Sequence, residues 1–562
     1  MSTPKRVASG TDVHRIIGEL DEAIGAGDDR IYQRTGHLVI VRGILAEDAK
    51  RLRIAFSPDD LILAPLDRAT LLPSISELVD YGTVVVDDDG THWKKAIPSI
   101  DVTSAFLRKK YWAHIRPIRS VSKTPIPHLD GSIASSGYDA PTKTLVASNV
   151  DLPALEASVS REDSTRALEE LAEPFAEFHF ASPTCRYAPV ALILTLLLRH
   201  SIAGNVPLFI FRAPQKDCGK SLVAKVACII ATGSTPAANS WSAEKDEQAK
   251  VLSAVASAGS SVVFFDNVGT GSTIGGAELD RVATCDGETA FRILGHNENR
   301  TLPWSTVVVF TSNRARIEGD TDRRSVIADL ERRSEPLERF MHDDVIDYVK
   351  RHRPRLLAAA FTLIRGWVQA GRPTCDVKRL SSFEVWARTV PSIIKWATPG
   401  AIDVRTLVPD VVGTDSDELE LKLLETIHNY LQAFGLRSVT VKAMVGKVFG
   451  APIGGGSGDT SPQRDAVTEL RDAIDALECT TGRGDNVTFD KRKFGKKLAG
   501  MSGVFYAPYR LEKDAMVHGH GQWNVTKVAA QVANGAVQRH DADVSGVSDS
   551  YTGDFIDDIL RT

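Results

Sequence analysis

Three short apolar runs, rich in β-branched and aromatic residues, mark the middle of the chain. They are VPLFIF at 206–211, SVVFF at 261–265 and STVVVF at 305–310. Segments with helical spacing separate them, and strands that alternate with helices are typical of a parallel α/β sheet. The pattern therefore predicts an α/β domain with a parallel sheet between Val206 and Asn313.

The residues before this region carry two different patterns. Short β-rich runs alternate with turns from about residue 30, which predicts an α+β domain over residues 1–150. Residues 152–204 have helical spacing and end in the apolar run PVALILTLLLR. We expect these helices to belong with the central domain, over residues 151–345.

The residues after the central domain divide into three parts. Helical spacing predicts a helical extension over 346–450, and a Gly/Ser-rich stretch follows it. Residues 451–528 pair a basic helical run with two strand-like pieces, which indicates a winged helix. Residues 529–562 lack any period and are expected to form a disordered acidic tail. The whole is an α/β multidomain protein.

Composition and charge narrow the class of protein. With 562 residues, 43% of them hydrophobic and 25% charged, the chain resembles a multidomain globular protein. Its longest apolar run, Pro189–Leu198, is too short to cross a bilayer, so we expect a cytoplasmic protein without a membrane partner. Six scattered cysteines indicate reduced thiols. A net charge of -5 limits nucleic-acid contact to local basic surfaces.

A phosphate-binding loop is predicted directly after the first apolar run. Such a loop needs inward backbone N–H groups, a lysine for the β/γ-phosphates and a hydroxyl for Mg²⁺. Lys220 and Ser221 supply the last two, although Pro214 replaces the usual first glycine. A simple helix cap is the alternative. We assign ATP binding to Pro214, Gln215, Lys216, Asp217, Cys218, Gly219, Lys220 and Ser221.

The second run delivers Asp266 and Asn267 at its carboxyl end, beside the predicted loop in a parallel sheet. Asp266 is therefore expected to complete the Mg²⁺ site with Ser221. Many such ATPases have a carboxylate at the next position, but Asn267 is an amide and cannot accept a proton. Either Glu247 or Glu278 is the base, or hydrolysis is slow. A plain turn is the alternative for Asp266.

Two further motifs complete the predicted catalytic set. Asn313 ends the third run, where its amide would orient the lytic water and sense the γ-phosphate. Arg323 and Arg324 follow shortly afterwards and are candidate arginine fingers for the nucleotide of a neighbouring subunit. A solvated surface pair is the alternative for the two arginines.

The order Lys220-Ser221, Asp266, Asn313, Arg323-Arg324 resembles the AAA+ P-loop ATPase core of superfamily 3 helicases. The stretch from IPHLDGSIASSGYD (126–139) to FEVWARTV (383–390) is similar to primase-helicase proteins of phages, plasmids and integrated elements. The resemblance implies a homo-oligomeric ring, a hexamer, that threads single-stranded DNA and uses ATP and Mg²⁺.

The resemblance also implies a DNA-binding β-hairpin before the sensor strand. Thr289–Trp304 lies at that place, with strand-like arms around a polar turn. Polar and cationic side chains suit contact with phosphates whatever the base sequence, although a plain surface hairpin would read the same way. The candidate DNA contacts of this hairpin are Arg292, His296, Asn297 and Arg300.

Two basic segments are further candidates for DNA contact. The predicted winged helix carries a lysine cluster, which we expect to bind origin or duplex DNA unless it is only a charged helix face. This cluster contains Lys491, Lys493, Lys496 and Lys497. The stretch Arg108–Arg119, with Tyr111 and Trp112, is either a nucleic-acid collar with stacking rings or one face of an amphipathic helix.

Two acidic segments have a functional and a plain interpretation. VVVDDDG at 84–90 is similar to a primase metal motif, but a hairpin turn explains it, and we expect no primase activity. The carboxyl end DFIDDILRT resembles the tip of bacterial single-stranded DNA-binding proteins, which docks on replication partners; a solvated tail is the alternative.

The sequence therefore predicts an ATP-dependent DNA helicase that translocates on single-stranded DNA, acts on forked DNA, and serves the replication of a mobile genetic element. The alternative is a nucleotide-switched DNA-binding initiator or defence ATPase that unwinds nothing. Asn267 is the feature that favours this alternative, because a switch does not need rapid turnover.

Overall fold

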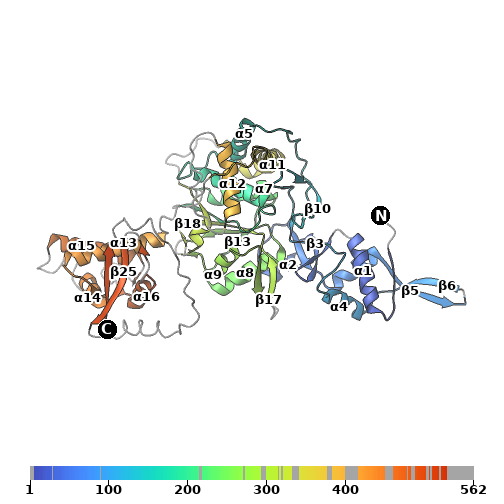
Figure 1. The fold of residues 1–562 in the computed structure, drawn as a ribbon, viewed down its shortest axis with the longest axis horizontal. Coiled ribbons are helices and arrows are strands. Elements are labelled where there is room, and N and C mark those ends of the chain that lie inside the picture. The colour runs from blue at the N-terminus through green and yellow to red at the C-terminus, as the bar shows by residue number, and fades with distance from the viewer. Residues whose placement is uncertain are drawn as a thin grey trace. The chain divides into compact units, whose positions relative to one another are not determined.

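The computed structural model forms two compact units, Met1–Val412 and Gly413–Thr562, and each is described here by itself (Figure 1). The division falls inside the expected helical extension at 346–450. The described residues are 5–27, 30–88, 90–213, 218–269, 272–292, 299–313, 315–317, 320–331, 341–375, 383–398, 415–449, 460–477, 479–481, 488–501, 505–506, 509–517 and 520–527.

The first unit begins with an α+β region of two small sheets, in the orders β1-β5-β6 and β2-β3-β4. β5 and β6 pair antiparallel up to Asp87↔Gly90, so VVVDDDG forms a hairpin. The elements are β1 (Lys5–Ala8), α1 (Val13–Gly27), β2 (Ile31–Arg34), β3 (His37–Gly43), α2 (Ala46–Leu52), β4 (Leu61–Pro65), α3 (Arg68–Leu78), β5 (Val79–Asp87), β6 (Gly90–Lys95) and α4 (Ile100–Arg108).

The basic stretch 108–119 is not a helix, because α4 ends at Arg108. Trp112 is 0% exposed and packs edge-on against Phe106, so its ring is unavailable for stacking on a base. Lys109 pairs with Asp21 at 2.8 Å. Tyr111, 67% exposed, is the aromatic ring of this stretch that faces solvent. The amphipathic-helix interpretation is wrong, and the collar loses one of its two stacking rings.

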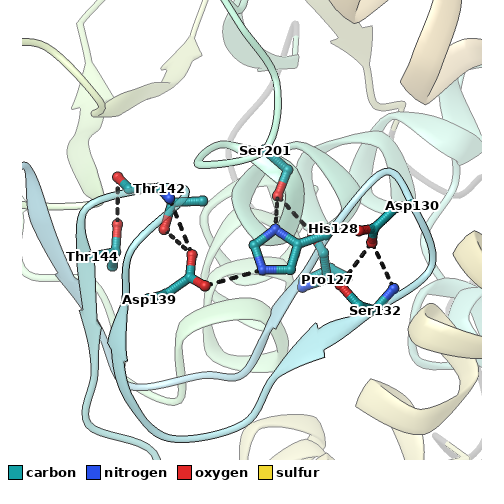
Figure 2. A network of polar contacts seen from close by, with 8 residues as sticks. All are labelled: Pro127, His128, Asp130, Ser132, Asp139, Thr142, Thr144 and Ser201. Atoms are coloured by element: carbon teal, nitrogen blue, oxygen red, sulfur yellow. Dashed lines mark hydrogen bonds and ion pairs between the residues drawn. The ribbon is translucent and has the colours of Figure 1, made fainter.

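Short strands form the segment that contains IPHLDGSIASSGYD. In Figure 2, His128 lies between Asp139 and Ser201, with Nε2 3.3 Å from Asp139 Oδ1 and Nδ1 3.5 Å from Ser201 Oγ. Ser201 Oγ donates to Pro127 O at 2.7 Å, so the set fastens this segment to the residues after α6. The strands are β7 (Ser120–Ser122), β8 (Ile126–Pro127), β9 (Ile133–Ala134), β10 (Gly137–Asp139) and β11 (Thr144–Val146).

A five-stranded sheet lies at the centre of the first unit, in the order β13-β14-β18-β12-β20, and every pairing in it is parallel. The three apolar runs form β12, β14 and β18, which confirms the expected parallel sheet. The strands are β12 (Leu208–Ala213), β13 (Ala238–Asn239), β14 (Val262–Val268), β18 (Val307–Asn313) and β20 (Ser325–Asp329).

Helices cover both faces of this sheet, which explains why its strands are apolar at nearly every position. Phe209 and Phe211 of β12 pack with α6, α7, α11 and α12, whereas Leu208 and Ile210 pack with α8 and α9. These helices are α6 (Ala188–Leu198), α7 (Lys220–Thr232), α8 (Lys245–Ala258), α9 (Ala277–Ala283), α11 (Val345–Gln369) and α12 (Glu384–Ala397).

Smaller elements complete the first unit. β16 and β17 form an antiparallel hairpin, and β15 pairs with β19 in parallel. The elements are α5 (Arg161–Ala172), η1 (Glu173–Phe175), η2 (Cys185–Tyr187), β15 (Thr273–Ile274), β16 (Glu288–Arg292), β17 (Asn299–Pro303), β19 (Arg316–Ile317) and α10 (Asp320–Arg323). Across the described residues, no helix combines the length and the apolarity that a bilayer span requires.

The second unit packs helices against a four-stranded sheet in the order β21-β26-β25-β24. The expected basic helix is α16, and a long β-hairpin, β25–β26, follows it. The elements are α13 (Asp415–Ala433), β21 (Val439–Thr440), α14 (Val441–Phe449), α15 (Ser461–Ala476), β22 (Thr480–Thr481), β23 (Thr488–Phe489), α16 (Lys491–Met501), β24 (Phe505–Tyr506), β25 (Tyr509–Val517) and β26 (His520–Lys527).

Candidate nucleotide-binding site

The junction between β12 and α7 carries the predicted phosphate loop. Gly219 adopts φ +81°, and a Cβ there would lie 2.6 Å from the Phe178 ring, so both the backbone and the space require glycine. Lys220 begins α7 and is 7% exposed, whereas lysine is rarely buried in proteins. Pro214, Gln215, Lys216 and Asp217 lie outside the described residues.

The two predicted Mg²⁺ ligands meet at the carboxyl edge of the sheet. Ser221 Oγ donates to Asp266 Oδ1 at 2.5 Å. Thr311 Oγ1 of β18 donates to the same oxygen at 2.6 Å and is fully buried. A hydroxyl and a carboxylate fit Mg²⁺, which usually takes one or two protein oxygens and completes its shell with phosphates and water.

Asp266 is held in its ionised form. Burial raises the pKa of its carboxyl, but hydrogen bonds from Ser221 and Thr311, together with the Lys225 ammonium, outweigh burial and leave the pKa below its ordinary value. Lys225 Nζ lies 3.5 Å from Asp266 Oδ2. Neither Lys225, one helical turn after Ser221, nor Thr311, two residues before Asn313, is among the residues predicted from the sequence.

Asn267 and Asn313 form a pair of amides beside Asp266. The strand is bulged between Phe265 and Val268, and Asn267 adopts φ +58°, a conformation that asparagine tolerates better than most residues. Its backbone N–H donates to Thr311 Oγ1 at 2.8 Å. Asn313 Nδ2 donates to Asn267 Oδ1 at 3.0 Å. The amide of the predicted sensor Asn313 therefore touches the amide of Asn267.

The two glutamates considered as general bases are engaged elsewhere. Glu247 in α8 pairs with Lys250 at 2.5 Å, and Glu278 in α9 pairs with Arg281 at 2.6 Å. Each glutamate is thus held by a basic residue of its own helix.

A pocket of about 320 Å³ borders the phosphate loop. Its lining includes Phe178, which contacts Gly219, and Leu222 in the first turn of α7. His342 forms another wall and stacks on Tyr348, with ring centroids 3.6 Å apart. Both side chains contact Glu173: His342 Nε2 lies 2.7 Å from one carboxylate oxygen, and the Tyr348 hydroxyl donates to the other. No motif in the sequence indicates this pocket, because its walls come from segments far apart in the chain.

Arg323 and Arg324 lie at the opposite edge of the sheet from Lys220. Because β20 runs parallel to β12, Arg324 lies beside the start of β12, where its carbonyl accepts from Leu208 N at 2.9 Å. The phosphate loop begins at the other end of β12, about 17 Å away for a six-residue strand. That span exceeds the length of an arginine side chain, so neither arginine reaches Lys220 of the same chain.

The environments of the two arginines differ. Arg324 is 23% exposed and pairs with Asp280 at 3.1 Å and with Asp320 at 3.0 Å. Arg323 is 53% exposed and pairs with Asp320. Arg323 is therefore the more accessible of the two.

The hairpin expected at Thr289–Trp304 is present, with Phe291↔Arg300 and Arg292↔Asn299 in register. Phe291 and Trp304 are buried under it, and Arg292 is exposed. His296 and Asn297 lie outside the described residues. Arg300 therefore shares the face of buried Phe291, whereas Arg292 lies with Asn299 on the other face of the hairpin.

The lysines of α16 are not equivalent. Lys493 is exposed, whereas Lys497 forms an ion pair with Glu420 of α13. The side chains of Lys491 and Lys496 lie outside the described residues. Lys497 is thus already paired within its own unit.

The chain was compared with known families and structures. No protein-family model matches it, and no curated protein matches it. An apo structure of the NrS-1 C-terminal region aligns at 11% identity over 79% of this chain and 96% of that one, with a TM-score of 0.32. A second A-form apo structure of that region, residues 305–718, aligns at 10% identity over the same shares with a TM-score of 0.32. Similarities at this level leave the family of the chain open.

Proposed function

We propose that this protein is an AAA+ ATPase of the superfamily 3 helicase type that translocates on single-stranded DNA as a ring, in the replication of a mobile genetic element. The observation that carries the proposal is the meeting of Lys220, Ser221, Asp266 and Asn313 at one edge of the parallel sheet. These residues come from α7, β14 and β18 and are spread over nearly a hundred positions of the chain.

The order of the central sheet supports the AAA+ assignment. The strand that ends in Asn313, β18, lies between the phosphate-loop strand β12 and the Asp266 strand β14. This order places the proposed sensor Asn313 next to both the phosphate loop and Asp266, as its proposed role requires. The carboxyl ends of the strands are also where α/β sheets bind ligands.

Each group at this edge has a role in nucleotide hydrolysis. Lys220 and the first N–H groups of α7 would bind the β- and γ-phosphates. Ser221 and Asp266 would hold Mg²⁺, which supplies charge stabilisation to the phosphoryl oxygens. Asn313 would orient the attacking water. The pocket beside Phe178 and Leu222 would receive the adenine base of ATP.

The position of the arginines supports a ring. Arg323 and Arg324 lie too far from the phosphate loop of their own subunit to stabilise its transition state. In a ring, the carboxyl ends of a neighbour's strands would pack against the amino ends of these strands. The neighbour's phosphate loop would then receive Arg323, which is more exposed than Arg324. Such a contact joins two different surfaces, and contacts of that kind form a ring when the rotation between neighbours closes.

Two surfaces are proposed to bind DNA. The β16–β17 hairpin carries Arg292 and Arg300 and would contact single-stranded DNA. The second unit has the element order helix, β21, helices, then the β25–β26 hairpin, with β21 paired to β26, which supports a winged helix with α16 as its basic helix. Its exposed Lys493 would contact duplex or forked DNA.

A second function is favoured by one observation, the amide pair Asn267–Asn313. If no carboxylate serves as a base, ATP binding alone would change the assembly state of a DNA-binding initiator or defence ATPase. The two functions differ in turnover. A motor hydrolyses ATP faster on DNA, whereas a switch binds ATP and hydrolyses it hardly at all.

Steady-state ATP hydrolysis with and without single-stranded DNA tests the proposal. We expect wild type to be stimulated by DNA and Lys220→Ala to lose both basal and stimulated turnover. Circular dichroism and ATP binding by wild type establish that the protein is folded and competent. If wild type binds ATP but DNA does not alter its hydrolysis, the motor is excluded and the switch takes its place.

A further inference from the structure

The short helix α9 carries two adjacent charged residues that reach different neighbours. Asp280 contacts α10 and the residue that follows it, and Arg281 contacts the hairpin strand β16. Figure 1 places α9 beside α8 on the face of the sheet that also carries the hairpin. One rigid helical turn therefore lies between the arginine pair and the proposed DNA hairpin.

Asp280 is bound to the arginine side by two contacts. Its Oδ1 accepts from Thr321 Oγ1 at 2.8 Å, and Thr321 is fully buried. The same oxygen lies 3.1 Å from a terminal nitrogen of Arg324. A displacement of Arg324 would therefore act on α9 directly.

Arg281 is bound to the hairpin side by one guanidinium that makes several contacts. It donates to Thr289 Oγ1 and to the Ala290 carbonyl, both at 2.6 Å, and lies 5.1 Å from the Phe291 ring centroid. Glu278 on the same helix fixes the guanidinium at 2.6 Å. Planar guanidinium groups with several donors transmit orientation as well as charge.

The helix is also tied to the nucleotide edge of the sheet. In the chain, β14 with Asp266 is followed by β15 and then by α9. β15 pairs with β19, which lies just after Asn313. Gly276, at φ +123°, starts α9, and a Cβ there would lie 2.8 Å from Gln248 Oε1. Gln248 Nε2 also donates to Gly275 O at 2.9 Å. The start of α9 is thus held by Gln248 of α8.

We propose that Asp280 and Arg281 are positioning residues that make α9 the mechanical link between Arg324 and the β16–β17 hairpin of the same subunit. The inference rests on the proposed function, in which Arg323 and Arg324 detect a neighbour's nucleotide and the hairpin contacts single-stranded DNA. The state of the neighbour's nucleotide would then set the position of this subunit's own hairpin.

Two residues provide matched controls. Ser253 of α8 donates to the Arg292 carbonyl at 3.0 Å, so it anchors the hairpin without contacting Asp280 or Arg324. Asp320 belongs to α10, where it pairs with Arg323 and Arg324. Ser253→Ala therefore removes a hairpin anchor, and Asp320→Asn removes an arginine contact, with the α9 link left in place.

The first experiment measures ATP hydrolysis with and without oligo(dT), and oligo(dT) affinity by fluorescence anisotropy, in the full-length protein. Arg281→Met should lower the DNA-stimulation ratio about five-fold, with basal hydrolysis and DNA affinity within about two-fold of wild type. Arg281→Lys should recover part of the ratio, and Ser253→Ala should keep it. An unchanged ratio in Arg281→Met, or an equal loss in Ser253→Ala, would overturn the link.

The second experiment separates failure of the link from failure of the proposed function. Hydrogen exchange of residues 288–303 should be about three-fold faster in Asp280→Asn than in wild type, and unchanged in Asp320→Asn. Wild-type exchange in Asp280→Asn would contradict the link even if the protein is a motor. If wild type shows no DNA stimulation, the motor fails, and the exchange result still decides the link.

Discussion

Ser221 Oγ lies 2.5 Å from Asp266 Oδ1, although 45 residues separate them in the chain. The contact joins the first turn of α7 to the end of β14. Thr311 of β18 donates a hydrogen bond to the same oxygen of Asp266. Three elements of one sheet edge therefore converge on a single carboxylate oxygen, which is the arrangement expected for a Mg²⁺–phosphate site.

Asp266 should stabilise the fold in a pH-dependent way. Its pKa in the folded protein lies below its ordinary value, so the folded state favours the ionised form. The contribution to the free energy of unfolding is present at pH values above the ordinary carboxyl range and is lost as pH falls through the folded-state pKa. Urea denaturation of wild type and Asp266→Asn at pH 7 and pH 3 checks this; the difference between the two proteins should shrink at pH 3. A difference that grows on acidification would contradict the environment described for this carboxylate.

Gly219→Ala should destabilise the protein by about 2 kcal/mol or more, because alanine is strained at φ +81° and its Cβ would collide with Phe178. Chemical denaturation measures the loss, and isothermal titration measures the accompanying weakening of ATP binding. Adding Phe178→Ala to Gly219→Ala removes the collision but keeps the backbone strain. The double variant should therefore be less destabilised than the sum of the two single variants, and strict additivity would show that the ring is not in the way.

Asn267→Asp tests whether the missing acid limits hydrolysis. Aspartate keeps the shape of asparagine, tolerates the positive φ and can still accept from Asn313 Nδ2. If the amide limits turnover, kcat should rise about ten-fold with little change in ATP affinity, since a positioned base contributes roughly a hundred-fold or more in favourable cases. Single-turnover hydrolysis measures the chemical step, with Asn267→Gly as the control that removes the amide and tolerates the positive φ. A fall in kcat for Asn267→Asp would mean that the amide itself is required.

Part of the site could be predicted from the sequence because parallel strands end at one edge. Lys220, Ser221, Asp266 and Asn313 each follow an apolar run, so their proximity follows from the sheet alone. Thr311 was missed because its role depends on the register between β14 and β18, which the apolar pattern does not specify.

Other parts of the structure could not be predicted for physical reasons. Phe178 lies about forty positions before Gly219 in the chain, and no local sequence pattern indicates that the two residues are close. One of the two interpretations of the basic stretch had Trp112 stack on nucleic acid, but the tryptophan ring is instead buried against Phe106. The edge strand β13 has two residues and leaves almost no β pattern in the sequence.

The claim that each nucleotide site is shared between two subunits has a direct test. Lys220→Ala and the double variant Arg323→Ala, Arg324→Ala should each be inactive as pure oligomers, because every interface lacks either the lysine or the arginines. Mixed in equal amounts under conditions of subunit exchange, they should recover DNA-stimulated hydrolysis, since roughly a quarter of the interfaces then combine an intact lysine with an intact arginine pair. No recovery in oligomers shown to contain both variants, or full activity of the arginine variant alone, would contradict the shared site.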